Sequence, residues 1–96
     1  MDFEQIVFSR HAISRMFEQS ISVEQAKKIV RDGKKIHSYP DDKPYPSYLY
    51  LGFEGDRPIH VVAAYNQEEN LCIVVTVYEP DPSLWSKDFT TKIIKL

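Results

Sequence analysis

The chain has 96 residues, of which 43% are hydrophobic and 27% are charged, and it contains a single cysteine. A chain of this length buries about 60 to 65% of its unfolded surface and supports one hydrophobic core, so we expect a single domain over residues 1–96. The composition lacks the apolar depletion that marks disordered proteins. Cys72 alone excludes an internal disulfide framework, and the three histidines show no zinc-ligand spacing. We therefore expect neither a metal nor a cofactor.

The formal net charge of −2 argues against a protein that coats nucleic acid by bulk electrostatics. No apolar run approaches the roughly 18 to 20 residues that a membrane span requires. The first residues also lack the basic and apolar regions of a signal peptide. These absences lead us to expect a cytoplasmic protein that does not contact membranes.

Two short helices are predicted near the N-terminus, after the apolar stretch 6–8. Ser9 is a good N-cap for a helix from Arg10 to Gln19, whose apolar stripe should face the core. The residues of this stripe are Ala12, Ile13, Met16 and Phe17. Ser22 and Gln25 form a capping box that opens a second helix, and Gly33 offers a left-handed residue to end it.

Basic residues crowd the end of the second predicted helix and the residues after it. They are Lys27, Lys28, Arg31, Lys34 and Lys35. Residues 1–39 hold seven Lys and Arg against five Asp and Glu, whereas residues 40–96 hold five against nine. One interpretation is a solvated face, because cations complement the carbonyl end of a helix. The other is a patch that contacts the phosphates of RNA.

From residue 34 the hydrophobic pattern changes toward a period of 2, which is typical of strands. The sequence predicts strands over residues 35–39, 47–53, 58–65 and 71–78, with a proline-rich loop after the first. Pro80 and Pro82 end the last of these, and residues 89–94 form either an edge strand or a packed tail. We therefore predict an α+β fold in which the two helices pack on a 4- to 5-stranded antiparallel meander.

The register of the last hairpin decides which residues share a face. If Tyr65 pairs with Leu71, His60 lies opposite Thr76 and Val61 opposite Val75. One face is then almost wholly apolar and suits the helices. Its residues are Ile59, Val61, Ala63, Tyr65, Leu71, Ile73, Val75 and Val77. A one-residue bulge would reverse this division.

Two groups of polar residues could carry chemistry. His11 and Arg15 are neighbours on the first helix, and an imidazole beside a permanent cation suits phosphate binding or proton transfer. His60, with Thr76 and Tyr78, could supply an acid or base and a hydrogen-bond donor. Each group could equally be structural, since Arg15 can pair with Glu18 and a cross-strand His–Thr pair is an ordinary sheet contact.

The aromatic residues and the cysteine also have two interpretations. Trp85 could anchor the C-terminal tail or stack on a base. The run of Tyr39, Tyr45, Tyr48 and Tyr50 could line a recognition surface, although aromatic residues are ordinary strand formers. Cys72 lies in mid-strand and is expected to be a small buried hydrophobe.

Five motifs occur in order along the chain, namely H-A-x-x-R at 11–15, I-S-x-x-x-A at 21–26, Pro58 to Val62, T-V-Y-x-P at 76–80, and Trp85. Together they resemble a bacterial and archaeal domain family of unknown function that is grouped with RelE-like and BrnT-like toxins. The resemblance spans about residues 8–88. It implies a RelE-like fold and metal-independent RNA cleavage, with His11, Arg15, His60 and Tyr78 as catalytic positions and Thr76 in support. The acidic charge departs from typical ribosome-dependent toxins.

Two hypotheses follow. In the first, the chain is a ribonuclease-type toxin that acts on RNA and is paired with an antitoxin-like protein. In the second, it is a non-catalytic interaction module that binds a protein partner. A single catalytic site requires His11 and Arg15 to border His60 and Tyr78. That is possible only if the first helix lies at a sheet edge or end, or if a bulge changes the register.

Overall fold

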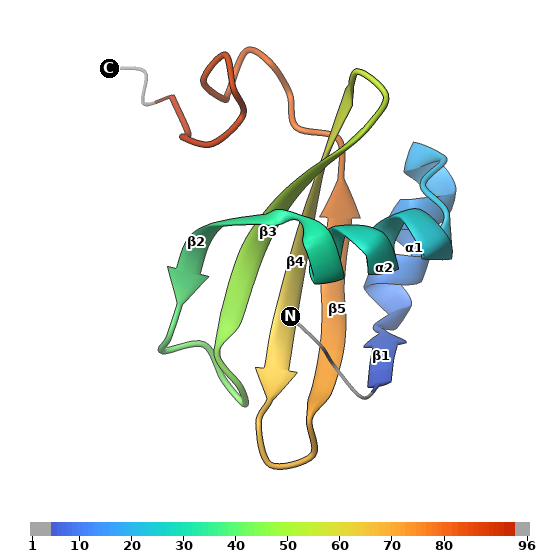
Figure 1. Cartoon of the computed structure of the whole chain (residues 1–96), viewed down its shortest axis with the longest axis vertical. Helices are drawn as coiled ribbons and strands as arrows, with labels where there is room; N and C mark the ends of the chain where they lie inside the picture. Colours follow the sequence, from blue (N-terminus) through green and yellow to red (C-terminus); the bar gives the residue numbers. More distant parts are fainter. Residues whose placement is uncertain (1–4, 94–96) are drawn as a thin grey trace.

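The computed structural model describes residues 5–93, which form two helices and a five-stranded mixed sheet (Figure 1). The elements in chain order are β1 (Gln5–Phe8), α1 (Arg10–Gln19), α2 (Val23–Asp32), β2 (Lys34–Tyr39), β3 (Ser47–Glu54), β4 (Arg57–Asn66) and β5 (Leu71–Tyr78). The strand order is β1-β5-β4-β3-β2. None of the helices within residues 5–93 is long and apolar enough to cross a membrane.

Strands β2 to β5 form the predicted antiparallel meander, but the prediction of a wholly antiparallel sheet is wrong. Strand β1 pairs with β5 in parallel, with Gln5 opposite Leu71 and Phe8 opposite Val74. The sequence showed this segment only as a short apolar stretch, because its pairing partner lies more than sixty residues away along the chain. Of the two alternatives for residues 89–94, the described residues 89–93 form the packed tail, and Ile94 lies outside the described residues. Within the described residues, the tail makes one isolated bridge between Trp85 and Lys92.

Local capping explains where both helices begin. The Ser9 side chain accepts a hydrogen bond from the Ala12 backbone N–H at 3.0 Å, and Ser22 and Gln25 make the predicted capping box. The left-handed residue is Ser20 at the end of α1, with φ 55°, whereas Gly33 is extended. Gly33 is instead required by close packing, because a Cβ there would lie 2.4 Å from the Ile29 carbonyl oxygen.

Helix α1 uses only half of its predicted apolar stripe for the core. Ala12 and Met16 are buried, but Ile13 is 54% exposed and Phe17 is 89% exposed. Successive residues are about 100° apart around a helix, so Ile13 and Phe17 lie on one flank of the buried pair. The prediction that all four residues face the core is therefore wrong for these two.

Two shifts overturn the predicted register of the last hairpin, since Tyr65 pairs with Cys72 rather than Leu71 and a β-bulge farther along β5 adds a second shift. Val62 pairs with Thr76 and Ala63 pairs with Val74, so Val75 is the extra residue. His60 consequently faces Tyr78 rather than Thr76. The helix-facing core contains Ile59, Val61, Ala63 and Val77, as predicted, but Cys72 and Val74 replace Ile73 and Val75.

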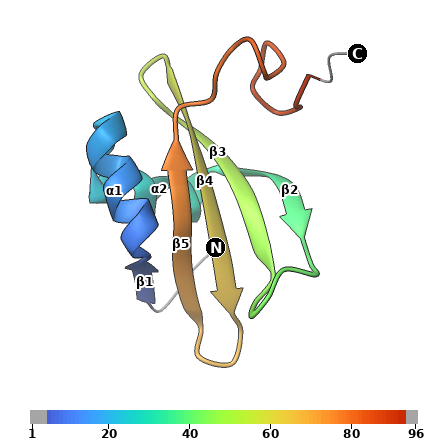
Figure 2. The same cartoon turned by 180° about the vertical axis from the view of Figure 1, so that it is seen from behind.

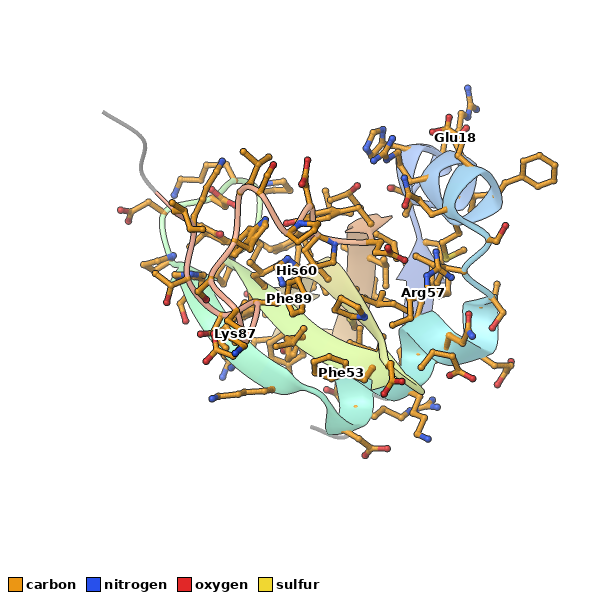
Figure 3. The ribbon with its side chains drawn as sticks, turned by 90° about the horizontal axis from the view of Figure 1, so that it is seen from above. Glu18, Phe53, Arg57, His60, Lys87 and Phe89 are labelled. Atoms are coloured by element: carbon orange, nitrogen blue, oxygen red, sulfur yellow. The ribbon has the colours of Figure 1, made fainter. Side chains whose placement is uncertain are left out.

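The other face of the sheet is partly covered by the C-terminal tail. From behind and from above, the tail lies across the end of the sheet on the side opposite α2 (Figures 2 and 3). Trp85 in the tail is 9% exposed, and its ring lies 4.4 Å from the His60 ring in an edge-to-face arrangement. Leu49 and Leu51 of β3 are also buried and are not part of the helix-facing core. The sheet thus has a buried layer on each side.

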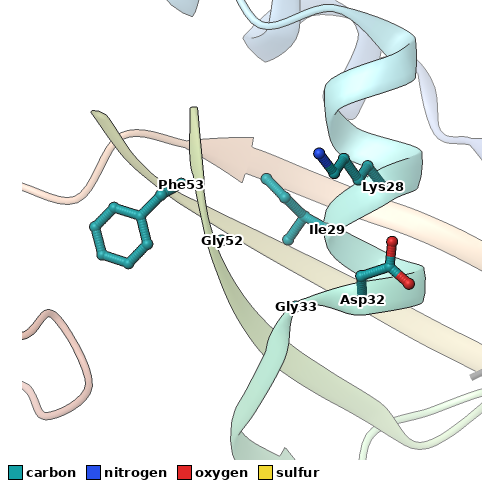
Figure 4. Close-up of a pocket in the computed structure, with 6 residues that line it drawn as sticks. All are labelled: Lys28, Ile29, Asp32, Gly33, Gly52 and Phe53. Carbon is teal, nitrogen blue, oxygen red and sulfur yellow. The ribbon is translucent and has the colours of Figure 1, made fainter. Parts of the chain in front are cut away.

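Gly52 of β3 lets α2 approach the sheet closely. A Cβ at Gly52 would lie 2.4 Å from Cγ1 of Ile29, and the close-up shows this side chain between α2 and the strand (Figure 4). We expect Gly52→Ala to reduce the free energy of unfolding by about 1–3 kcal/mol through overpacking. Combining it with Ile29→Ala, which removes Cγ1, should cost less than the sum of the two single changes. Urea unfolding of the four proteins measures this coupling, and strict additivity would show that the two residues do not clash.

Candidate functional site

Helix α1 is attached to the bulged strand at its first residue. The Ser9 backbone N–H donates to the Val74 carbonyl at 3.0 Å, and the Ser9 hydroxyl donates to the Val75 carbonyl at 2.9 Å. The bulge therefore offers two consecutive carbonyls to the residue that caps α1. This attachment fixes the first turn of α1, and with it His11, against the edge of β5.

His11 and Thr76 meet across this junction. The His11 Nε2 atom lies 3.1 Å from the Thr76 hydroxyl, within hydrogen-bond distance, and His11 is exposed to solvent. Arg15 follows one helical turn later and makes an ion pair with Glu18 at 3.1 Å. An exposed pair of this kind contributes at most about 1 kcal/mol, so a phosphate group could replace the carboxylate.

His60 is enclosed rather than open to a substrate. It is fully buried, with Nε2 2.9 Å from the Phe89 carbonyl and Nδ1 3.2 Å from the Tyr78 hydroxyl. A carbonyl can only accept, so Nε2 carries the proton and Nδ1 accepts from the Tyr78 hydroxyl. Burial lowers the pKa of His60, which favours the neutral ring. In this arrangement His60 holds the tail through Phe89 and orients the phenol of Tyr78.

The two predicted polar groups adjoin along β5. Thr76 contacts His11, Tyr78 contacts His60, and these two strand residues are two positions apart on the same face. That spacing corresponds to about 6.6 Å along a strand. The structure therefore brings His11, Thr76 and Tyr78 to one stretch of the sheet edge, with His60 behind Tyr78. Burial also raises the pKa of Tyr78, so its hydroxyl remains a donor at neutral pH.

Arg57 was not singled out from the sequence, yet it fixes the other end of α1. Its guanidinium donates to the carbonyls of Gln19 and Ser20, and it also pairs with Glu79 just after β5. Figure 3 shows Arg57 beneath the end of α1 that carries Glu18. Nothing local signals this role, because an arginine after a hairpin turn resembles any solvated residue. With Ser9 at one end and Arg57 at the other, α1 is held along β5.

The predicted RNA-binding lysines and arginine lie elsewhere on the molecule. Lys27, Lys28 and Arg31 belong to α2, while Lys34 and Lys35 begin β2. Strand β2 is separated from β5 by β3 and β4, which corresponds to about 14 Å across the sheet. Lys34 and Lys35 are therefore not continuous with His11. The ammonium of Lys35 lies 4.0 Å above the ring of Tyr48.

The remaining titratable candidates are inert or structural. Cys72 is completely buried, and burial raises the pKa of its thiol to about 12, so it carries no thiolate at neutral pH. Among residues 5–93, no three His, Cys, Asp or Glu side chains gather closely enough to hold a metal ion.

The model of the family described as a domain of unknown function (DUF4258) matches residues 8–79, which are 72 of the 96 residues. No curated protein and no solved structure matches the chain significantly. Membership of a domain family of unknown function, as the sequence motifs predict, is thereby confirmed. The grouping with toxins and the RelE-like fold stay predictions.

The buried His60 makes stability depend on pH. Its pKa is lowered in the folded state, so below about pH 6.5 the unfolded chain binds a proton that the folded chain excludes. We expect the free energy of unfolding to fall between about pH 6.5 and 5, by up to about 1.4 kcal/mol per pH unit from this residue. Urea unfolding at several pH values should show a flatter profile for His60→Gln, although that variant is less stable at pH 8. Equal slopes for the two proteins would contradict a buried neutral His60.

Proposed function

The chain belongs to the DUF4258 family, and we propose that it is a toxin-type, metal-independent endoribonuclease whose site lies where α1 meets β5. The observation that carries this proposal is the contact between His11 and Thr76, which joins the two polar groups that the sequence motifs contain. Arg15 and Tyr78 flank this contact from the helix and the strand. A RelE-like fold belongs to the same proposal, supported by two helices beside an antiparallel meander.

RNA cleavage without a metal needs a base, an acid and a cation. The 2′-hydroxyl attacks the adjacent phosphorus and forms a new P–O bond, while the bond to the 5′-oxygen breaks. In the proposed site His11 takes the proton of the 2′-hydroxyl, and Thr76 orients the imidazole. Arg15 leaves Glu18 to hold the phosphate, whose negative charge it stabilises. Tyr78 turns its hydroxyl from His60 Nδ1 to the departing 5′-oxygen and gives up its single proton there.

The charge distribution indicates which RNA such a site would accept. Residues 40–96 are acidic by four charges, nine against five, and a surface of that sign repels RNA in proportion to the phosphates it meets, which are far more numerous on the ribosome than on a short unpaired strand. The proposed substrate is therefore free single-stranded RNA, cleaved independently of the ribosome. The antitoxin-like partner of such an enzyme would protect the producing cell.

The test compares RNA cleavage and growth after expression of matched variants. His11→Gln should lower the cleavage rate by about 100-fold or more, since proton transfer contributes about 10²–10⁴-fold. Arg15→Gln should lower it by a similar factor, because the charge on the phosphate loses its stabilising cation. Both changes should also relieve any growth arrest that the wild type causes. His37→Gln is the control, because it removes an exposed histidine on β2 instead. Intact RNA with the wild type, or equal cleavage by His11→Gln, would exclude the ribonuclease.

A second candidate function, the non-catalytic interaction module, is favoured by the outer surface of α1. The phenyl ring of Phe17 is 89% exposed and Ile13 is 54% exposed one turn earlier. Two large apolar side chains at this spacing form a continuous surface on a helix, and such surfaces mark contacts with other proteins. In this function His11 and His60 are structural, and a protein partner covers Ile13 and Phe17.

This candidate predicts that Phe17 serves binding and not folding. Phe17→Ser should change the free energy of unfolding by no more than about 0.5 kcal/mol, because the ring is already in solvent. Met16→Ser is the matched control, because Met16 precedes Phe17 on the helix but is buried. This change should destabilise the protein by several times as much. Urea unfolding measures both changes. A large loss for Phe17→Ser would show that the ring contributes to the fold and would remove the support for this candidate.

A further inference from the structure

A second polar and aromatic site lies at the end of the sheet that the tail does not cover. A cavity of about 390 Å³ opens between the proline-rich loop before β3 and the turn that joins β4 to β5. Its volume falls within the range of about 300–1,000 Å³ that is usual for small-molecule sites. The lining residues are Pro44, Tyr45, Pro46, Tyr48, Tyr65, Asn66, Gln67 and Glu68. We call this cavity the tyrosine pocket.

Three tyrosines from three different segments line the tyrosine pocket, and the structure holds two of them in place. Asn66, which is 7% exposed, donates from Nδ2 to the Tyr45 hydroxyl at 3.1 Å. The Tyr65 hydroxyl donates to Asn70 Oδ1 at 2.9 Å. Tyr48 and Tyr65 also pack against the helix-facing core. Aromatic rings that are held in this way offer preformed flat surfaces, which lowers the entropy cost of stacking a planar ligand.

Polar groups of two kinds accompany the rings. The exposed side chains of Gln67 and Glu68 line the pocket, and an amide and a carboxylate are groups that hydrogen-bond the edges of bases. The ammonium of Lys35 lies 4.0 Å above the ring of Tyr48. A cation beside a stacking ring is the combination that binds a base together with its phosphate.

We propose that the tyrosine pocket binds one unpaired nucleotide of a single-stranded RNA, with the base between the tyrosines and its phosphate at Lys35. The inference rests on the proposed function in taking RNA as the ligand, and it adds the place where the RNA is recognised. A proline-rich peptide would use the same rings, but its carbonyls are neutral and pair with the Lys35 ammonium more weakly than a phosphate does. The lysine therefore favours the nucleotide.

The bound nucleotide is not the one that is cleaved. Tyr65 pairs with Cys72, and Cys72 is four residues before Thr76 on β5, which corresponds to about 13 Å. A stacked strand advances about 3.4 Å per nucleotide, so a stacked RNA that occupies both sites extends over about four nucleotides. The tyrosine pocket would thus select RNA by a base some distance from the cut.

The test uses a fluorescein-labelled ten-nucleotide RNA of mixed sequence with 2′-O-methyl groups throughout, which lacks the 2′-hydroxyl needed for cleavage. Anisotropy titrations of the full chain should give affinities about 5- to 150-fold weaker for Tyr48→Leu and Tyr65→Leu, the loss that one stacked base predicts. Tyr48→Phe retains the ring and should lose much less affinity than Tyr48→Leu does. Tyr39→Leu removes an exposed tyrosine outside the pocket and is the control. If Tyr48→Leu or Tyr65→Leu fails to fold, Tyr45→Leu takes its place, because Tyr45 lines the pocket from a loop.

The outcomes separate this inference from the proposed catalytic function. Loss of affinity in the Leu variants, with no RNA cleavage by the wild type, would support the pocket and exclude the ribonuclease. Cleavage that depends on His11, with equal affinity in wild type and Leu variants, would overturn the pocket alone. Absence of oligonucleotide binding by the wild type would overturn it as well. A proline-rich peptide that binds in place of the oligonucleotide, and is lost with Tyr48→Leu, would assign the pocket to a protein ligand.

Discussion

The extra residue of β5, Val75, is the constraint on which the rest of the structure depends. Because of the bulge, Cys72 and Val74 point into the core below it and Val77 does so above it. The same bulge presents the carbonyls of Val74 and Val75 to Ser9, which starts α1 at the sheet edge. Without the additional residue, one half of β5 would turn its apolar side chains away from the helices. Core packing and the meeting of His11 with Thr76 thus have the same cause.

The two faces of the sheet are buried by different means. The helix-facing layer is wholly apolar apart from the phenols of its tyrosines, and its β4 residues are those that the period-2 pattern identifies. The other layer includes His60, whose two ring nitrogens both hydrogen-bond, one with the Tyr78 hydroxyl and one with the Phe89 carbonyl. A buried imidazole with both nitrogens satisfied avoids the cost of an unpaired polar group. His60 therefore fixes the tail with directional bonds.

Local signals in the sequence predicted the parts of the fold that depend on neighbouring residues. The N-cap at Ser9, the capping box at Ser22 and the hairpin-length gaps each act within a few positions, and the helices and the meander follow from them. The parallel pairing of β1, the bulge at Val75 and the covering tail depend on contacts between distant residues. No pattern of period 2 or 3.6 encodes such contacts. The exposure of Phe17 was not predicted, because the width of an apolar stripe on a helix does not reveal how much of that stripe the sheet covers.

For the candidate site, the sequence identified the residues, but it did not predict which of them contact one another. His60 and Tyr78 are in contact, but the cross-strand partner of His60 is Tyr78 rather than Thr76, and the tail encloses the imidazole. Thr76 became a partner of His11 because the bulge places it at the free edge of β5 above the end of β1. Arg57 could not be identified, since its three acceptors come from segments more than twenty residues away.

Helix α1 is held at both ends, and the residues that hold it are not the ones that it exposes to solvent. Ser9 and Arg57 fix the helix to β5, and Ala12 and Met16 bury its inner side. None of these contacts needs an exposed phenyl ring at position 17, and a polar residue there would retain helix propensity and improve solubility. His11 and Arg15 lie on the opposite flank of the same helix, since residues four apart share a side and Phe17 is about 120° from His11. A rigid helix with a polar pair on one flank and an apolar pair on the other can therefore present two ligands with separate surfaces.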